Sequence, residues 1–278
     1  MKYLFLLFSL CLAFSIKADI THIPRHDLKN IKYLFKNLID EHDYAYTIFG
    51  SKPMSLADYG LESPPNLSFY RKLRSKFLMF KRRSSLNSWY KYRDKFALKD
   101  FIFLDEEKDW VDCLVLVLIN KKNLLRVLRD HVSIFKDELG ENFTPEAFLE
   151  KFEKRQMSIA TAINNSQKLM GIMLGYGVRN ATLFQDRVDI MKDMRQREKN
   201  NLPEDEMLKK ELADIKSQCG GFSEFEEDAI IPPLYFLADT SHTETIELKR
   251  QYEKDRQKIE EMMETPNFMD MVLQRLIE

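Results

Sequence analysis

The chain has 278 residues, of which 44% are hydrophobic and 31% are charged, and its formal net charge is −1 at pH 7. This composition supports a folded core and excludes a disordered chain, and the length fits one large domain or two small ones. The near-neutral charge gives the whole chain no preference for nucleic acid or for any other charged partner.

The first residues have the layout of a secretory signal peptide. Lys2 precedes an uncharged apolar run from Tyr3 to Ile16, and Ala18 is the small residue that a cleavage site needs. The run is shorter than the roughly 20 apolar residues that a membrane-spanning helix takes. We therefore expect residues 1–18 to be a cleaved signal peptide, the mature protein to be periplasmic or secreted, and membrane attachment only through an uncleaved signal segment.

Residues 25–39 have apolar residues at helical spacing, which predicts the first helix of the expected mature chain. Residues 44–60 then break the period with glycines and a proline, which predicts an ordered loop. Residues 68–96 predict one or two helices, with apolar side chains on one face at Phe69, Leu73, Phe77 and Phe80.

Two β-type apolar runs follow, "FIFLD" from Phe101 and "WVDCLVLVLI" from Trp110. The polar "EEKD" between them predicts a hairpin at about 101–119. The second run is apolar almost throughout, which is typical of a central strand covered on both faces. A further short strand is expected at about 234–239, starting late or lying at an edge because Pro232 and Pro233 precede it.

The rest of the chain predicts helices. One follows residue 122 and ends at Gly140, and another begins with Pro145. Ser241 and Glu244 have the spacing of a capping box at the start of a long helix. We therefore predict an α+β fold: a mostly helical single domain over residues 19–278 with a small antiparallel sheet.

The stretch "KLMGIMLGYGVRNA", Lys168 to Ala181, holds three of the eight glycines of the chain. It begins like a G-x-G-x-x-G dinucleotide loop, but Asn180 replaces the third glycine and the preceding residues have helical spacing instead of forming a strand. The pattern favours a helix that ends near Gly175 in a left-handed cap, with Gly171 allowing close approach to a neighbour. A ligand-lining role for the turn remains open, and its candidate residues are Lys52, Tyr176, Arg179 and Asn180.

The segment 69–99 is strongly basic and carries interleaved aromatic residues, with Asp94 as its only acidic residue. Such a mixture suits single-stranded nucleic acid or an anionic membrane surface. Export argues against nucleic acid. The remaining alternatives are a solvated helix face that packs its aromatic residues inward, and a site for an anionic lipid, a glycan or a partner protein.

Motifs for catalysis and metal binding are lacking. The chain has no G-x-S-x-G nucleophile motif, and Cys113 and Cys219 do not lie in a recognisable protease context. Asp239, His242 and Glu244 lie close in sequence, but without the histidine spacing of zinc hydrolases. We therefore assign no catalytic residue, no metal ligand and no cofactor, and leave open whether the two cysteines pair.

Four segments follow one another in an order that resembles a known family: "YTIFGSKPMS", "LVLINKKNLLRVL", "LMGIMLGYGVRNATLF" and "PPLYFLADTSHTETIELKRQYEKDRQKI". They are similar to an uncharacterised family of predicted exported proteins from chlamydia-like obligate intracellular bacteria. The resemblance covers most of the expected mature chain and supplies no activity, cofactor or catalytic residue. It implies export and a role in the envelope or facing the host.

The sequence thus predicts an exported bacterial protein that acts by binding a partner. The alternative is an exported hydrolase or transferase with a site at the Gly175–Asn180 turn, completed by a histidine from elsewhere in the chain.

Overall fold

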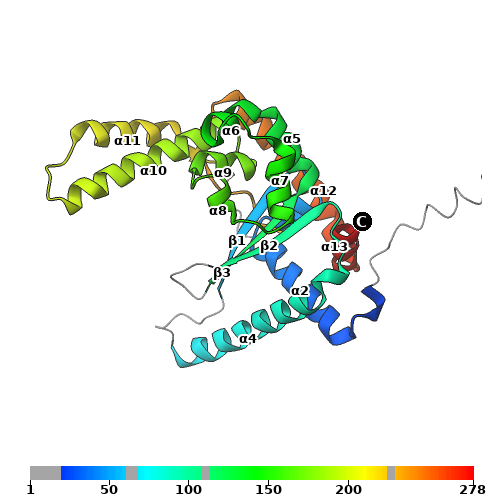
Figure 1. Cartoon of the computed structure of the whole chain (residues 1–278). Helices are drawn as coiled ribbons and strands as arrows, with labels where there is room; N and C mark the ends of the chain where they lie inside the picture. The colour runs from blue at the N-terminus through cyan, green and yellow to red at the C-terminus, as the bar shows by residue number, and fades with distance from the viewer. Residues whose placement is uncertain (1–19, 61–67, 108–112, 224–228) are drawn as a thin grey trace, which may run out of the picture.

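The structure is a computed structural model that describes residues 20–60, 68–107, 113–223 and 229–278. The expected signal peptide lies outside these residues. The described residues form a mostly helical α+β fold with a three-stranded antiparallel sheet and a second sheet of two strands, as the sequence predicts (Figure 1).

Helices outnumber strands among the described residues. The first half contains η1 (Ile20–His22), α2 (Arg25–Glu41), α3 (Tyr44–Ile48), β1 (Met54–Gly60), α4 (Phe69–Tyr92), η2 (Arg93–Lys95), β2 (Phe101–Glu107), β3 (Cys113–Asn120), α5 (Lys121–Asp130) and α6 (Val132–Leu139). The second half contains α7 (Pro145–Glu153), α8 (Ile159–Ala162), α9 (Gln167–Met173), α10 (Val178–Lys199), α11 (Glu206–Gln218), β4 (Gly220–Gly221), β5 (Leu237–Ala238), α12 (Thr243–Met263) and α13 (Phe268–Ile277).

The three-stranded sheet has the order β1-β3-β2, with both pairs antiparallel. Val117 of β3 stands opposite Leu56 of β1 and Leu104 of β2. The expected hairpin is confirmed as β2–β3, with β3 in the central position. The strand expected near residues 234–239 forms as β5, but it pairs with β4 in the separate sheet.

The other edge of the main sheet is β1, which corrects the expectation of a loop at residues 44–60. The same stretch also contains the short helix α3. Gly50 and Pro53 suggest a loop when the sequence is read alone, yet they only separate these two elements. In β1 the buried Ala57 and Tyr59 flank the exposed Asp58, which is the alternation of a half-covered strand.

The sheet separates two hydrophobic cores. One core packs α2, α3, α12, α13 and the C-terminal half of α4 on one face, and the other packs α5 to α9 on the opposite face. Alternating residues of β3 enter the two cores, Leu116 and Leu118 on one side and Val117 and Ile119 on the other. This explains why the central strand is apolar at successive positions.

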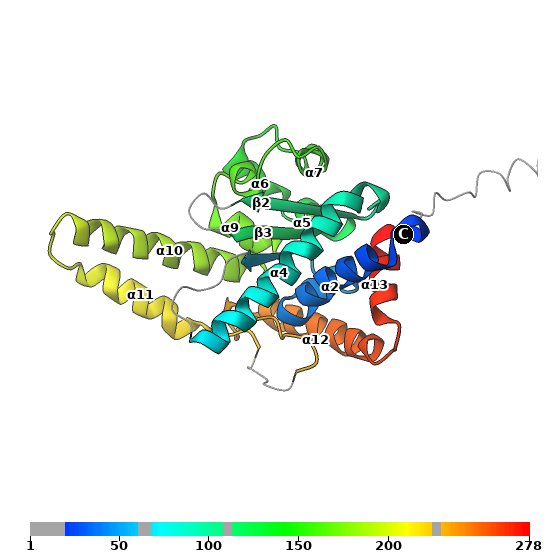
Figure 2. The same ribbon diagram turned by 90° about the horizontal axis from the view of Figure 1, so that it is seen from below.

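Two helical projections extend beyond these cores (Figures 1 and 2). In one, α10 and α11 lie side by side around a small apolar cluster that includes Leu183, Ile190 and Ile215. The other is the N-terminal half of α4. We call residues 69–80 the α4 arm.

Candidate functional site

The glycine stretch forms a turn between α9 and α10, which confirms the helix-ending interpretation. Gly175 and Gly177 have positive φ angles of 80° and 82°, so both occupy the backbone region that favours glycine. A Cβ at Gly175 would collide with the Tyr252 hydroxyl, and one at Gly171 would lie 2.8 Å from Cβ of Ala181 in α10. The glycines therefore allow close packing of backbone and side chains.

The N-terminus of α10 is already occupied by a carboxylate of the same chain. Glu244 accepts hydrogen bonds from the backbone N–H groups of Val178 at 2.8 Å and Arg179 at 2.9 Å. A bound phosphate would use these donors, because they are the free N–H groups of the first helical turn. The turn is thus closed internally where a nucleotide loop would be open.

This contact also corrects the expected capping box of α12. The N-cap residue of α12 is His242, whose side chain makes no capping hydrogen bond, and the Ser241 hydroxyl instead donates to Asp239 at 2.7 Å. Glu244 does cap a helix, but the helix is α10. The first-turn N–H groups of the adjacent α10 give the Glu244 carboxylate two donors, whereas a capping box on α12 would give it one.

Lys52, the first of the four candidate ligand residues, is fully buried. Its ammonium donates to the Leu174 carbonyl at 2.5 Å and lies 3.5 Å from Oδ2 of Asp43 and 4.9 Å from the ring centre of Tyr176. Burial lowers the pKa of Lys52, although Asp43 acts in the opposite direction. The lysine joins the start of β1 to the end of α9.

Tyr176 continues this contact into an aromatic stack. Its ring lies 4.1 Å from the ring centre of Phe236, which in turn stacks on Phe222 at 4.3 Å. Burial raises the pKa of the Tyr176 hydroxyl. The tyrosine therefore packs between chain segments that are distant in sequence.

Asn180 is only 2% exposed and is bonded within the fold. Its amide donates to the Tyr176 carbonyl at 2.8 Å and to the Thr245 hydroxyl at 3.0 Å, and its Oδ1 accepts from the Asp239 N–H at 2.9 Å. Arg179 is half-exposed, and its Nε lies 3.2 Å from Oδ2 of Asp239. The hydrogen bonds of Arg179 and of Asn180 thus tie α10 to the segment that precedes α12.

A pocket of about 270 Å³ does lie beside the turn, but none of the four predicted residues lines it. Its wall includes Ser51, Arg126, His131, Gly175 and Tyr252. Lys52 contacts Tyr176, and Asn180 bonds to the Tyr176 carbonyl and, like Arg179, to Asp239. In the described residues no histidine takes part in these contacts. This geometry gives no argument for the enzyme alternative.

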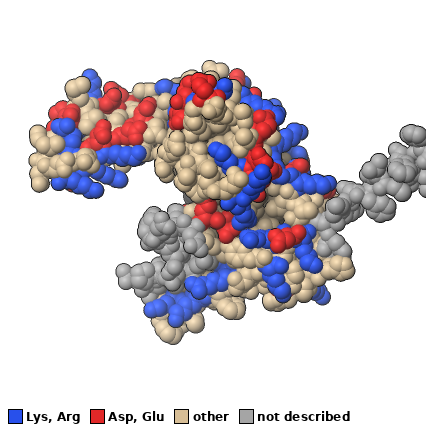
Figure 3. Space-filling model, viewed as in Figure 1, with Lys and Arg blue, Asp and Glu red and all other residues tan. Residues whose placement is uncertain are grey.

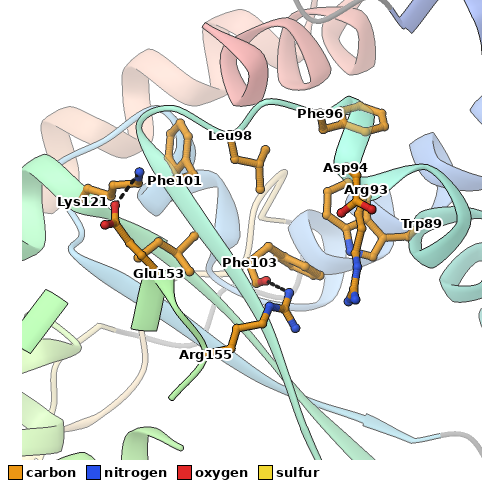
Figure 4. Close-up of a pocket in the computed structure, with 11 residues that line it drawn as sticks. Trp89, Arg93, Asp94, Phe96, Leu98, Phe101, Phe103, Lys121, Glu153 and Arg155 are labelled. Carbon is orange, nitrogen blue, oxygen red and sulfur yellow. Dashed lines mark hydrogen bonds and ion pairs between the residues drawn. The ribbon is translucent and has the colours of Figure 1, made fainter. Parts of the chain in front are cut away.

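A second pocket, of about 490 Å³, lies where the end of α4 meets β2 and α7 (Figure 4). Three cations line it, and each has a carboxylate partner in the chain: Lys121 pairs with Glu153 at 2.7 Å, and Asp105 pairs with Arg155 at 3.1 Å and Arg93 at 3.7 Å. The charges of this pocket are therefore balanced within the fold, which weakens any case for an anionic ligand.

The described part of the chain contains no assembled metal-binding or thiol site. No group of three or more His, Cys, Asp or Glu side chains there could hold a metal ion. Cys219 is a free thiol, and burial raises its pKa. The structure describes the backbone of Cys113 but not its side chain.

The aromatic residues of segment 69–99 fall into a buried group and an exposed group. Phe69–Tyr92 forms one continuous helix, α4, which η2 follows. The later aromatic residues Trp89, Tyr92 and Phe96 are buried, as the inward-packing interpretation requires. The large apolar residues of the arm are instead exposed to solvent, with exposed fractions of 75% for Phe69, 83% for Tyr70, 62% for Leu73, 55% for Phe77, 39% for Leu78 and 70% for Phe80.

The arm is exposed because its packing partner stops short of it. Side-chain contacts between α2 and α4 begin at Lys81 and Arg82, which reach Tyr33 and Glu41, and continue through Ser84 and Ser88. The arm lies beyond this contact and extends past the body of the molecule (Figure 1).

The arm also carries unbalanced positive charge. Residues 69–80 contain no Asp or Glu, and their four basic side chains have no ion-pair partner among the described residues; they are Arg71, Lys72, Arg74 and Lys76. Figure 3 shows Lys and Arg gathered over this helix. Local charge and exposed apolar area thus coincide on one element.

No helix in the described ranges is long and apolar enough to cross a membrane. The chain matches no family model, and the searches of curated proteins and of solved structures find no similar protein.

Proposed function

We propose that the protein is an exported binding protein that contacts its partner through the α4 arm. Export rests on the signal-peptide pattern of residues 1–18. The observation that supports the arm is the exposure of six large apolar side chains on one helix that carries only positive charge. Contiguous apolar surface of this kind marks interaction sites, since a folded protein otherwise buries it.

The fold itself does not need these side chains. They lie outside the two cores, and the helix is held by Trp89 and its neighbours in the second half. No packing within the fold therefore compensates for the unfavourable free energy of leaving these apolar side chains in water. A partner that covers them would remove this unfavourable contribution.

The test uses washed envelopes from the cells that make the protein. The purified mature chain should sediment with these envelopes, and the variant Phe69→Ser, Leu73→Ser, Phe77→Ser should bind about tenfold more weakly or less. The matched control is Met207→Ser, Tyr235→Ser, which changes two exposed apolar residues, 81% and 74% exposed, elsewhere on the surface. Equal binding of the arm variant and the wild type would refute the proposal.

A further inference from the structure

We infer that the partner of the α4 arm is the anionic surface of a lipid bilayer, on which the helix lies flat with its apolar face in the lipid. This inference rests on the proposed function and names the partner of the same surface. Three features support it: the position of the apolar residues around the helix, the position of the charges beside them, and the like charge of a second copy.

Five of the six large apolar residues that the arm exposes share one face, and Leu78, which is 39% exposed, lies outside that face. At about 100° per residue, the directions of Phe69, Phe80, Leu73, Phe77 and Tyr70 all fall within an arc of about 100°. An arc of this width is what a helix needs to sink one side into the boundary between headgroups and acyl chains. A helix buried in a protein core would need a covering element, and α2 does not extend over the arm.

The basic residues border this face on both sides. By the same geometry of about 100° per residue, Lys72 and Lys76 lie next to one edge of the arc, and Arg74 and Lys81 lie next to the other. Long basic side chains in these positions can keep their apolar stems against lipid while their charges reach the phosphates. The arrangement fits a plane of negative charge, which both borders of the apolar face can contact at the same time.

A second copy of the chain is a poor partner for the same face. Two arms packed face to face would bring their bordering Lys and Arg side chains together without an acidic residue in residues 69–80 to balance them. Like charges at such distances repel, and the repulsion is strongest where the contact excludes water. An anionic bilayer has the opposite sign and attracts each basic residue near its surface.

The experiment measures binding of the full mature chain to protein-free vesicles of phosphatidylcholine, with or without about 30% phosphatidylglycerol. The wild type should bind the anionic vesicles and lose most binding when salt is raised to about 0.5 M, because surface charge is then screened. The apolar variant with serine at positions 69, 73 and 77 and the charge variant Lys72→Gln, Arg74→Gln, Lys76→Gln should each bind about tenfold more weakly. The Met207→Ser, Tyr235→Ser control should bind as the wild type does.

Two results would overturn the lipid inference and leave the proposed function standing. One is arm-dependent binding to envelopes without binding to protein-free vesicles, which would point to an acidic protein or glycan. The other is vesicle binding that the charge variant abolishes and the apolar variant does not, which would mean surface attraction without insertion. Envelope binding that does not depend on the arm would refute both proposals.

Discussion

At the scale of single residues, polar side chains at the α9–α10 turn act as internal connections. Lys52 reaches a backbone carbonyl 122 residues away at Leu174, and Asn180 bonds across 65 residues to Thr245. Glu244 provides the carboxylate at the start of α10. A group of polar residues near glycines resembles a ligand site in sequence because the same hydrogen-bonding capacity serves both purposes.

Gly175 gives a direct test of this structural role. Replacing it with alanine should lower the free energy of unfolding by about 2–4 kcal/mol, because the new Cβ meets Tyr252 and Pro53 at an unfavourable φ. The matched variant Gly60→Ala places its Cβ in open space and should change stability far less. Urea denaturation of the two variants makes the comparison, and equal losses would contradict the proposed packing at the turn.

Lys52 predicts a specific pH dependence. Its pKa in the folded protein lies below the usual 10.5, so between these two values the unfolded chain holds more protons than the folded one. The free energy of unfolding should therefore increase as pH rises between these two values, because of this group. The double variant Asp43→Asn, Lys52→Met removes the effect, and the wild type should gain stability relative to it as pH rises toward 10.5. Parallel pH profiles would show that Lys52 does not titrate as proposed.

At the scale of elements, α4 is one helix with two environments. Its second half packs Trp89 against Phe35 and Phe103 at ring-centre distances of 5.3 and 5.2 Å, while the arm stands in solvent. Helical spacing of aromatic residues is present in both halves. Periodicity predicts which side chains share a face, but it does not predict whether another element covers that face.

The two halves should respond differently to mutation. The triple serine variant of the arm should change the free energy of unfolding by less than about 1 kcal/mol, because its side chains are already in water. Trp89→Ala should lower the free energy of unfolding by about 3–5 kcal/mol, because it leaves a cavity between the helix and the sheet. Chemical denaturation distinguishes them, and a large loss in the arm variant would mean that these residues serve the fold.

At the scale of the whole molecule, the sequence predicts the architecture better than the surfaces. The apolar run of β3 predicts a central strand because both of its faces must be covered, and the structure confirms it. The edge strand β1 was missed because its partner lies about 60 residues away in sequence, as in the pair Met54 and Ile119, and its flanking Gly50 and Pro53 suggest a loop. Burial of Lys52 and exposure of Phe69 both depend on such distant neighbours, which a local pattern does not contain.

The central claim is that the α4 arm is the binding element, and hydrogen–deuterium exchange of the mature chain bound to washed envelopes tests it most directly. The free arm has few tertiary contacts, so its amides should exchange quickly. Binding should slow exchange in residues 69–80 by about tenfold or more and leave α10 and α11 unchanged. Protection of the Gly175–Asn180 turn or of α10 and α11, with the α4 arm still exchanging quickly, would contradict the account.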